Sequence, residues 1–199
     1  TMSNDTVNTG RRQFLTAATS AVGVAGAVGI AVPFVGSWNP SAKAKAAGAP
    51  VKADISKVEP GQMIVVEWRG KPVYVMHRTQ QQTDDLPGLD PELKDPNSEI
   101  SEQPEYVDAG TRSIRPELMV FVGLCTHLGC APKFHPEVGA TNFADEGWKG
   151  GFFCPCHGST FDLAGRVYAG VPASANLIVP PYSFEGDNIL VVGVDSEAA

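Results

Sequence analysis

The chain has 199 residues, which is enough for one domain of ordinary size and an additional segment, and 43% of them are hydrophobic. A core of this size can form without a metal, so a metal site would not be needed merely for folding. The formal net charge is −7 and the sequence has no basic stripe. This charge argues against nucleic acid as a partner, because binding to phosphates requires lysine and arginine.

An export signal precedes the first apolar segment. The adjacent arginines Arg11 and Arg12 stand directly before an uncharged run over residues 14–35. A twin-arginine signal directs bacterial proteins to export after they have folded. The run can cross a hydrocarbon layer of roughly 30 Å at about 1.5 Å per residue, and it exceeds the usual secretory core of about 7 to 15 residues. We therefore predict a retained transmembrane anchor over residues 14–36, after a cytoplasmic tail over residues 1–13 that carries the signal.

The segment after the anchor is predicted to be a flexible tether. Residues 37–50 are rich in Ala, Gly, Pro, Ser and Lys and contain nothing large and apolar after Trp38, so they cannot pack a core. Within them, Ala42-Lys43-Ala44 resembles a small-residue cleavage site, which leaves removal of the signal as the alternative to a retained anchor. With the arginines in the cytoplasm, everything after Trp38 would lie outside, in the periplasm.

The remaining chain, residues 51–199, is predicted to be an all-β head. Short alternating or apolar runs indicate strands, and the head lacks long helical periodicity. The expected strands cover residues 62–68, 72–76, 118–124, 151–153, 182–185 and 189–194. Turns at residues 69–71 and 186–188 are expected to join two hairpins within this set.

An acidic segment, residues 79–108, separates two of these strands. Its only basic residue is Lys94. Its acidic residues are Asp84, Asp85, Asp90, Glu92, Asp95, Glu99, Glu102, Glu105 and Asp108. A run of charge is more often a solvated face than a binding site, so we expect a solvated insertion, although such a run can also steer a basic partner.

All four cysteines of the chain lie in two short boxes, residues 125–130 and 154–159. Each box also contains a histidine, so each loop offers one thiolate and one imidazole as metal ligands. This set fits either a structural zinc ion or a [2Fe–2S] centre in which one iron carries the histidines. The four cysteines could instead form two disulfides without metal, but His127 and His157 would then stand at ligand spacing by accident.

Two cysteines remain if each box supplies one thiolate. If both boxes approach one metal centre, Cys130 and Cys156 come close together, and an exported protein reaches an oxidising compartment in which such a pair joins. The bridge would lock the two loops together. In the chain-entropy model, closing a loop of about 26 residues contributes roughly 3 to 4 kcal/mol.

The other residues of the boxes favour an iron–sulfur centre over zinc. Gly129 and Gly158 follow the ligands where tight loops often need a positive φ, and Pro155 stiffens the second loop. Ser159 can offer its hydroxyl to an inorganic sulfide or to a ligand sulfur. A zinc site has less use for such a donor.

The two boxes resemble those of the Rieske iron–sulfur subunit of bacterial cytochrome bc1 complexes, the ubiquinol–cytochrome c reductases. The likeness continues through the twin-arginine anchor, the tether and the β-rich head. Rieske ferredoxins and ring-hydroxylating oxygenases typically lack the additional cysteine pair, so Cys130 and Cys156 argue against them. The resemblance implies an antiparallel Rieske-type sandwich with a small cluster-binding subdomain over about residues 122–175, on a single N-terminal transmembrane helix.

The same resemblance implies roles for individual positions. Cys125 and Cys154 would bind the inner iron of one [2Fe–2S] cluster, and His127 and His157 would bind the outer iron. Because imidazoles are neutral ligands, they raise the reduction potential of the cluster. Ser159 would raise it further by donating a hydrogen bond to a bridging sulfide.

Three further positions follow from the resemblance. High-potential members of the family have a tyrosine two residues after the serine, whereas this chain has Phe161, so we expect a lower potential. Pro172 belongs to residues 170–174, which correspond to the loop that covers the cluster, and Ser174 stands where a second proline is common. Leu128 is apolar and adjacent to a ligand, and would seal the docking face against the quinone pocket.

For function, the resemblance implies an electron-transfer subunit of a dimeric cytochrome bc1 complex in the bacterial inner membrane. A hydroquinone such as ubiquinol, bound in cytochrome b, would give one electron to the cluster and one proton to His157 or His127. Movement of the head on its tether would then pass the electron to cytochrome c1. The rivals are the Rieske small subunit of an arsenite-oxidase-type enzyme and, from another class, a periplasmic module with structural zinc.

Overall fold

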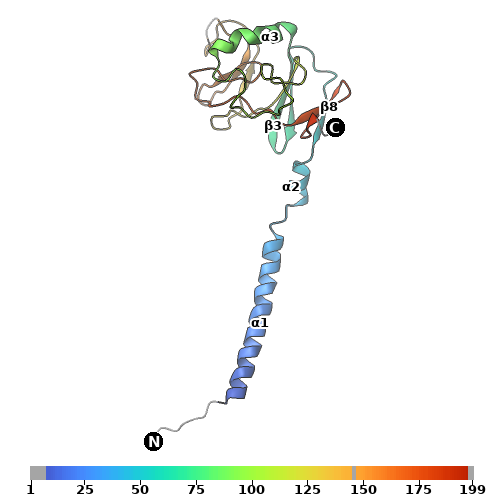
Figure 1. The fold of residues 1–199 in the computed structure, drawn as a ribbon, viewed down its shortest axis with the longest axis vertical. Helices are drawn as coiled ribbons and strands as arrows, with labels where there is room; N and C mark the ends of the chain where they lie inside the picture. The colour runs from blue at the N-terminus through green and yellow to red at the C-terminus, as the bar shows by residue number, and fades with distance from the viewer. Residues whose placement is uncertain (1–7, 145–146, 197–199) are drawn as a thin grey trace. The chain divides into compact units, whose positions relative to one another are not determined.

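The computed structural model describes residues 8–144 and 147–196. The chain divides into two compact units, Thr1–Ala46 and Ala47–Ala199, and the division lies within the segment predicted as a tether. Figure 1 shows the long helix of the first unit and the strands of the second.

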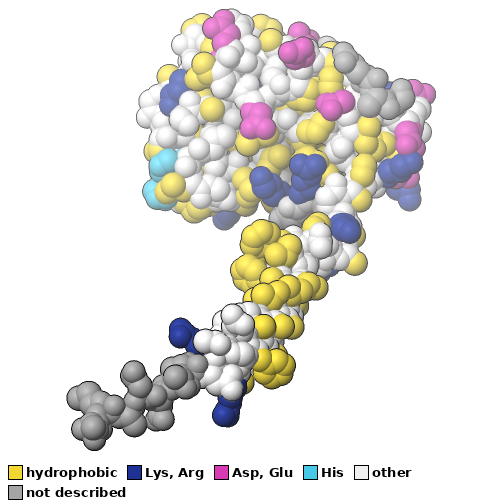
Figure 2. All heavy atoms as spheres, turned by 60° about the horizontal axis from the view of Figure 1, so that its bottom comes forward, with side chains coloured by type: hydrophobic (Ala, Val, Ile, Leu, Met, Phe, Trp, Pro, Cys, Tyr) yellow, Lys and Arg dark blue, Asp and Glu magenta, His cyan; other side chains and the backbone are white. Residues whose placement is uncertain are grey.

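The first unit consists mainly of helix α1 (Thr9–Gly36). The helix begins after Asn8, whose side chain accepts a hydrogen bond from the Arg11 backbone N–H at 3.1 Å, as is typical of an N-cap. By length and composition, α1 is able to cross a membrane. Apolar side chains cover it, and basic side chains lie near its N-terminal end (Figure 2). The short helix α2 (Ala42–Ala47) lies within the predicted tether, which is therefore not wholly irregular.

Among the described residues of the second unit, the strands form three antiparallel sheets. Their strand orders are β1-β9-β8, β2-β3-β4 and β5-β6-β7. The strands are Val51–Asp54 (β1), Met63–Trp68 (β2), Lys71–His77 (β3), Leu118–Val122 (β4), Lys133–His135 (β5), Gly151–Phe153 (β6), Thr160–Phe161 (β7), Tyr182–Glu185 (β8) and Ile189–Val192 (β9). The predicted fold class, an antiparallel all-β head following one apolar N-terminal helix, is confirmed.

The β2–β3 hairpin follows directly from its sequence. Its strands begin and end within one residue of the predicted runs, and Trp68 pairs with Lys71 across a two-residue turn. Both turn residues, Arg69 and Gly70, have positive φ angles of 51° and 70°. Two-residue hairpin turns favour this conformation because it matches the right-handed twist of the strands.

The sheet β2-β3-β4 lies between two hydrophobic cores. Along β3, Val73 and Val75 belong to the core shared with the β1-β9-β8 sheet, whereas Tyr74 and Met76 belong to the core that contains the cysteine boxes. Side chains in a strand alternate between the two faces of the sheet, so a strand buried on both faces is apolar throughout. The central sheet therefore supports the cysteine-containing half of the unit.

The acidic segment packs against the head along one side, while its other side is the expected solvated face. It forms helix α3 (Gln80–Asp85) and the 3₁₀ helix η1 (Leu86–Glu92). Its buried residues are Leu86, Leu89, Leu93, Asp95 and Val107. The leucines recur at intervals of three and four residues and cover one side of the segment, while most of its carboxylates remain exposed.

Buried arginines connect this segment to the cysteine-containing half. Arg166 donates from Nε to Asp162 at 2.8 Å, from Nη1 to Asp90 at 2.7 Å and from Nη2 to the Leu86 carbonyl at 2.7 Å. Arg112 donates to the Leu177 carbonyl at 2.7 Å. Burial of these charges is tolerated because hydrogen bonds and a buried carboxylate compensate them.

Candidate metal centre

The two cysteine boxes fold into loops with the same backbone hydrogen bonds. In the first box, the Cys125 N–H donates to the Cys130 carbonyl at 2.8 Å and the Gly129 N–H donates to the Cys125 carbonyl at 2.9 Å. In the second box, the Cys154 N–H donates to the Ser159 carbonyl at 2.7 Å. Its Gly158 N–H donates to the Cys154 carbonyl at 2.9 Å. The repeat seen in the sequence is therefore also a structural repeat.

A glycine closes each of these loops for the same conformational reason. Gly129 and Gly158 have φ angles of 80° and 78°, which non-glycine residues rarely adopt. A Cβ at either position would meet no atom within 4 Å. The requirement at both positions is therefore backbone conformation and not lack of space.

A disulfide joins the two loops. Cys130 and Cys156, 26 residues apart in sequence, are bonded, with a Cα–Cα distance of 6.6 Å. The predicted bridge is confirmed. The Sγ atoms of Cys130, Cys154 and Cys156 lie within 4.8 Å of one another, but the two bonded sulfurs are not available as thiolate ligands.

The two free cysteines are buried and the two histidines lie toward the surface. Cys125 and Cys154 belong to the hydrophobic core, whereas His127 is half-buried and His157 is exposed. The two imidazole rings lie edge to face, with nearly perpendicular planes and a centroid separation of 4.8 Å. Both boxes thus place a sulfur beneath the surface and an imidazole near it, which suits a two-iron centre with one end buried.

Two observations show that these side chains fit a metal cluster. The Nδ1 atom of His127 is buried and has no hydrogen-bond partner in the described part of the chain, although buried polar atoms normally have one. Burial raises the pKa of the Cys125 thiol, and the nearby Cys154 raises it further. A bound cation compensates for both effects, because it satisfies the imidazole nitrogen and neutralises thiolates.

The loop of residues 170–175 is hydrogen-bonded to both boxes. Ser159 is fully buried, and its Oγ accepts a hydrogen bond from the Ala173 N–H at 3.0 Å. Thr126 Oγ1 donates to the Ala175 carbonyl at 2.6 Å, so the first box also holds this loop. Pro172 is exposed at the outside of the loop. Nothing in the sequence indicates this contact of Thr126, because its acceptor is a distant backbone carbonyl.

Leu128 and Phe161 lie in opposite environments. Leu128 is 71% exposed although it is apolar, and it directly follows the ligand candidate His127 in the chain. Phe161 is fully buried on β7, where it pairs with Phe152 of β6 and belongs to the same core as Cys125 and Cys154. Leu128 can therefore contact a partner directly, whereas Phe161 acts only within the protein.

Known proteins match this chain over most of its length. Residues 50–183 match the family "Rieske [2Fe-2S] domain", and residues 1–41 match "Ubiquitinol-cytochrome C reductase Fe-S subunit TAT signal". The ubiquinol–cytochrome c reductase iron–sulfur subunit of Allochromatium vinosum is 53% identical over 198 residues, covering 100% of this chain and 95% of the relative. That of Bradyrhizobium diazoefficiens is 42% identical, covering 92% of this chain and 94% of the relative. The solved structure "Hyperthermophilic respiratory Complex III" has a TM-score of 0.48 and 25% identity, covering 87% of this chain and 98% of its own.

The chain therefore belongs to the Rieske [2Fe–2S] proteins, whose domain carries one [2Fe–2S] cluster. The match at the N-terminus and the sequence identity along the whole chain show to which group of Rieske proteins it belongs. It is a member of the ubiquinol–cytochrome c reductase iron–sulfur subunits, the Rieske subunits of cytochrome bc1. These matches favour an iron–sulfur centre over structural zinc, and the bc1 type over the arsenite-oxidase type.

Proposed function

We propose that the chain is the subunit through which electrons leave the quinol-oxidation site of a cytochrome bc1 complex. In this proposal, Cys125 and Cys154 hold one iron of the cluster, and His127 and His157 hold the other. When bound, the [2Fe–2S] cluster supplies one-electron chemistry. The observation that carries the proposal is the arrangement of two buried thiols and two adjacent imidazoles near the surface. The buried His127 Nδ1 atom has no hydrogen-bond partner in the described part of the chain, so it is available to bind a metal.

The exposed imidazole provides the proton acceptor. If His157 bound iron through one ring nitrogen and had lost the proton from the other, that second nitrogen could accept a proton from a hydroquinone hydroxyl. His127 is less exposed and is the second candidate for this role. The imidazole would hold this proton until the head leaves the site, and the bound cluster would take up the electron that leaves the hydroquinone with it.

The residues around the imidazoles prepare the site for docking. The exposed Leu128 side chain would cover the quinone pocket of cytochrome b and exclude water from the hydrogen bond. Ser159 would donate to a sulfur, which stabilises the reduced state and raises the potential. Gly129 and Gly158 give the loops their shape, Pro172 lies on the covering loop, and the disulfide holds the loops together.

The two units have separate tasks in the proposal. Helix α1 anchors the chain in the bacterial inner membrane and Arg11 and Arg12 remain in the cytoplasm, so residues 51–199 lie in the periplasm. The composition of residues 37–50 supports movement of the head between cytochrome b and cytochrome c1. The substrate class is a hydroquinone such as ubiquinol, and the complex is expected to be dimeric.

Complementation tests this function. In a bacterial strain that lacks its own Rieske subunit, the full chain should restore ubiquinol–cytochrome c reductase activity and copurify with haem-containing cytochromes b and c1. Cys154→Ser and His157→Ala should abolish both the activity and the electron paramagnetic resonance (EPR) signal of the reduced cluster. His135→Ala, which alters a histidine outside the boxes, should retain both. Copurification with a molybdenum protein, without restored quinol oxidation, would contradict the proposal.

A further inference from the structure

Lys94, the one basic residue of the acidic segment, contacts the loop that covers the cysteine boxes. Its Nζ donates to the Ala173 carbonyl at 2.6 Å and to the Val171 carbonyl at 3.2 Å. Among the described residues, the ion pairs do not include Lys94, although acidic residues surround it in sequence. The ammonium group therefore binds backbone carbonyls of a loop almost eighty residues away and not a neighbouring carboxylate.

The backbone fixes the lysine beside this loop. The Lys94 N–H donates to the Val167 carbonyl at 3.0 Å, and the Ala169 N–H donates to the Glu92 carbonyl at 2.8 Å. Leu93 and Tyr168 form an antiparallel bridge between these two bonds. Residues 92–94 thus form a short ladder with residues 167–169, and the covering loop begins directly after this ladder.

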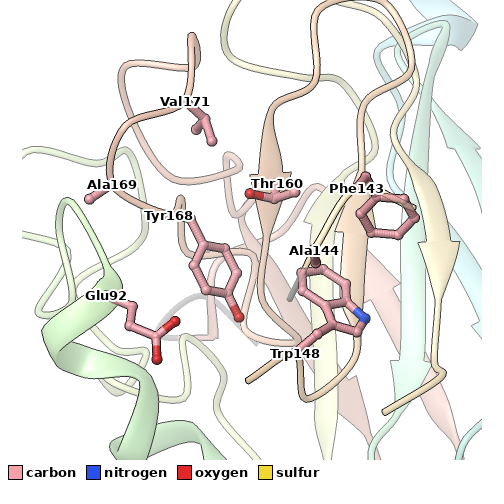
Figure 3. Close-up of a pocket in the computed structure, with 8 residues that line it drawn as sticks. All are labelled: Glu92, Phe143, Ala144, Trp148, Thr160, Tyr168, Ala169 and Val171. Carbon is pink, nitrogen blue, oxygen red and sulfur yellow. The ribbon is translucent and has the colours of Figure 1, made fainter. Parts of the chain in front are cut away.

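The loop packs against the core through Val171 and the buried Ala173, but its start also borders a cavity. A cavity of about 190 Å³ borders Ala169 and Val171 on one side and Glu92, Thr160 and Trp148 on the others. Figure 3 shows Ala169 and Val171 on the loop, across the opening from the indole of Trp148. A loop that borders a cavity lacks van der Waals partners there, so directed hydrogen bonds have a larger part in positioning it.

The same loop touches the serine next to the cluster ligands. Ser159 Oγ accepts a hydrogen bond from the Ala173 N–H at 3.0 Å, and Ser159 is the last residue of the box that begins at Cys154. Because Ser159 Oγ accepts a hydrogen bond from Ala173, the direction in which its hydroxyl donates depends on the position of Ala173. Lys94 binds the carbonyl of this alanine, so the lysine and the serine hold opposite sides of one residue.

We propose that Lys94 is a positioning residue: its hydrogen bonds to Val171 and Ala173 hold the covering loop over the boxes and thereby fix the direction in which the Ser159 hydroxyl donates its own hydrogen bond. The acidic segment then has the specific task of presenting this lysine. The effect on the loop and on the cluster is independent of the partner, whereas an effect on hydroquinone turnover rests on the proposed function.

The test compares Lys94→Met with Lys94→Arg in the full chain within membrane complexes. Lys94 is exposed, so its replacement leaves the core intact. Lys52→Met is the matched control, because Lys52 is also exposed and pairs with Glu185 on the β1-β9-β8 sheet. Three quantities are measured: hydrogen exchange of the peptide containing Ala173, the midpoint potential of the cluster by EPR titration, and kcat and KM for ubiquinol.

Lys94→Met should accelerate exchange of the Ala173 peptide by about three- to tenfold, since two hydrogen bonds from an exposed charged group are lost. It should also lower the midpoint potential and raise KM more than it lowers kcat. Lys94→Arg should keep the exchange rate, the midpoint potential and the kinetic constants close to those of the unsubstituted protein. Lys52→Met should change none of these quantities.

Two results would overturn the proposal. Unchanged exchange in Lys94→Met would show that the lysine does not hold the loop. Faster exchange with an unchanged midpoint potential would show that the position of the loop does not affect the Ser159 hydroxyl. If the unsubstituted chain supports no ubiquinol oxidation, the proposed function fails, but exchange and midpoint still decide the role of Lys94.

Discussion

At the scale of single residues, Phe161 is the position most directly connected to the redox property of the centre. It is fully buried on β7 in the same core as Cys125 and Cys154. A phenylalanine ring cannot donate a conventional hydrogen bond to a sulfur, whereas a tyrosine at this position can. Donors to ligand sulfur stabilise the reduced state, so we expect a lower potential with phenylalanine than with tyrosine at this position.

Phe161→Tyr should therefore raise the midpoint potential of the cluster. A hydrogen bond that favours the reduced state by roughly 1 kcal/mol corresponds to about 40 mV for one electron. Redox titration of the EPR signal measures the change. Phe161→Leu removes the ring without adding a donor and should not raise the midpoint. Equal effects of the two substitutions, or no rise in Phe161→Tyr, would show that the missing hydroxyl is not the cause.

At the scale of elements, the two boxes form loops of the same conformation, and a disulfide bond joins them. Each box begins at a buried cysteine and bends at a glycine with positive φ. The disulfide between Cys130 and Cys156 connects the loops at residues that do not serve as ligands. The bond restricts the unfolded chain and keeps the two ligand pairs together before metal binds.

Replacing Cys130 and Cys156 together by alanine should destabilise the head by about 3 kcal/mol, the entropy of closing a loop of this length. For a domain of this size, the expected fall in Tm is on the order of 5–15 °C. Thermal loss of the cluster's visible absorption, followed beside circular dichroism of the β-sheets, measures it. A variant that keeps the Tm of the unsubstituted protein would contradict a stabilising role.

The elements also show what could be predicted from the sequence. Alternation and turn residues gave the β2–β3 and β8–β9 hairpins almost to the residue, because their signals are local. The strands β1, β5 and β7 were missed, since they have only two to four residues and depend on partners far along the chain. In the acidic segment, the exposed carboxylates were expected, but the packed side formed by three buried leucines was not, because the charges are far more numerous.

The cluster site was predictable to a similar extent. Spacing within the boxes indicated one thiolate and one imidazole from each loop, because metal chemistry restricts which residue types can serve, and the family resemblance implied which cysteines would bind iron. The contacts of Lys94 and Thr126 could not be predicted, because their partners are backbone carbonyls, which every residue has. Side chains that bind distant backbone leave no pattern in a single sequence.

At the scale of the whole molecule, the chain separates anchoring from electron transfer. The apolar helix α1 and the β-rich unit are distinct compact units, and the boundary lies in a segment that lacks large apolar residues after Trp38. A segment of this composition has few contacts to restrain it, although it includes the short helix α2. The proposed movement of the head requires this freedom.

Replacing residues 37–50 by polyproline of equal length should slow ubiquinol–cytochrome c turnover severalfold without changing the EPR spectrum of the cluster. Polyproline is a semi-rigid spacer, whereas a Gly/Ser sequence of the same length stays flexible and serves as the control. Steady-state turnover in membranes, with cluster content determined from the EPR signal, is the measurement. Equal turnover with both tethers would exclude movement of the head as a necessary step.

The central claim is that Cys125, Cys154, His127 and His157 hold a [2Fe–2S] cluster that works at a quinol-oxidation site. The most direct test is the EPR spectrum of the reduced, membrane-bound protein with and without an inhibitor that occupies this site. The account predicts a reduced [2Fe–2S] signal whose shape changes when the inhibitor binds, because the occupant of the site contacts an imidazole ligand. A cluster signal that the inhibitor leaves unchanged would contradict the account.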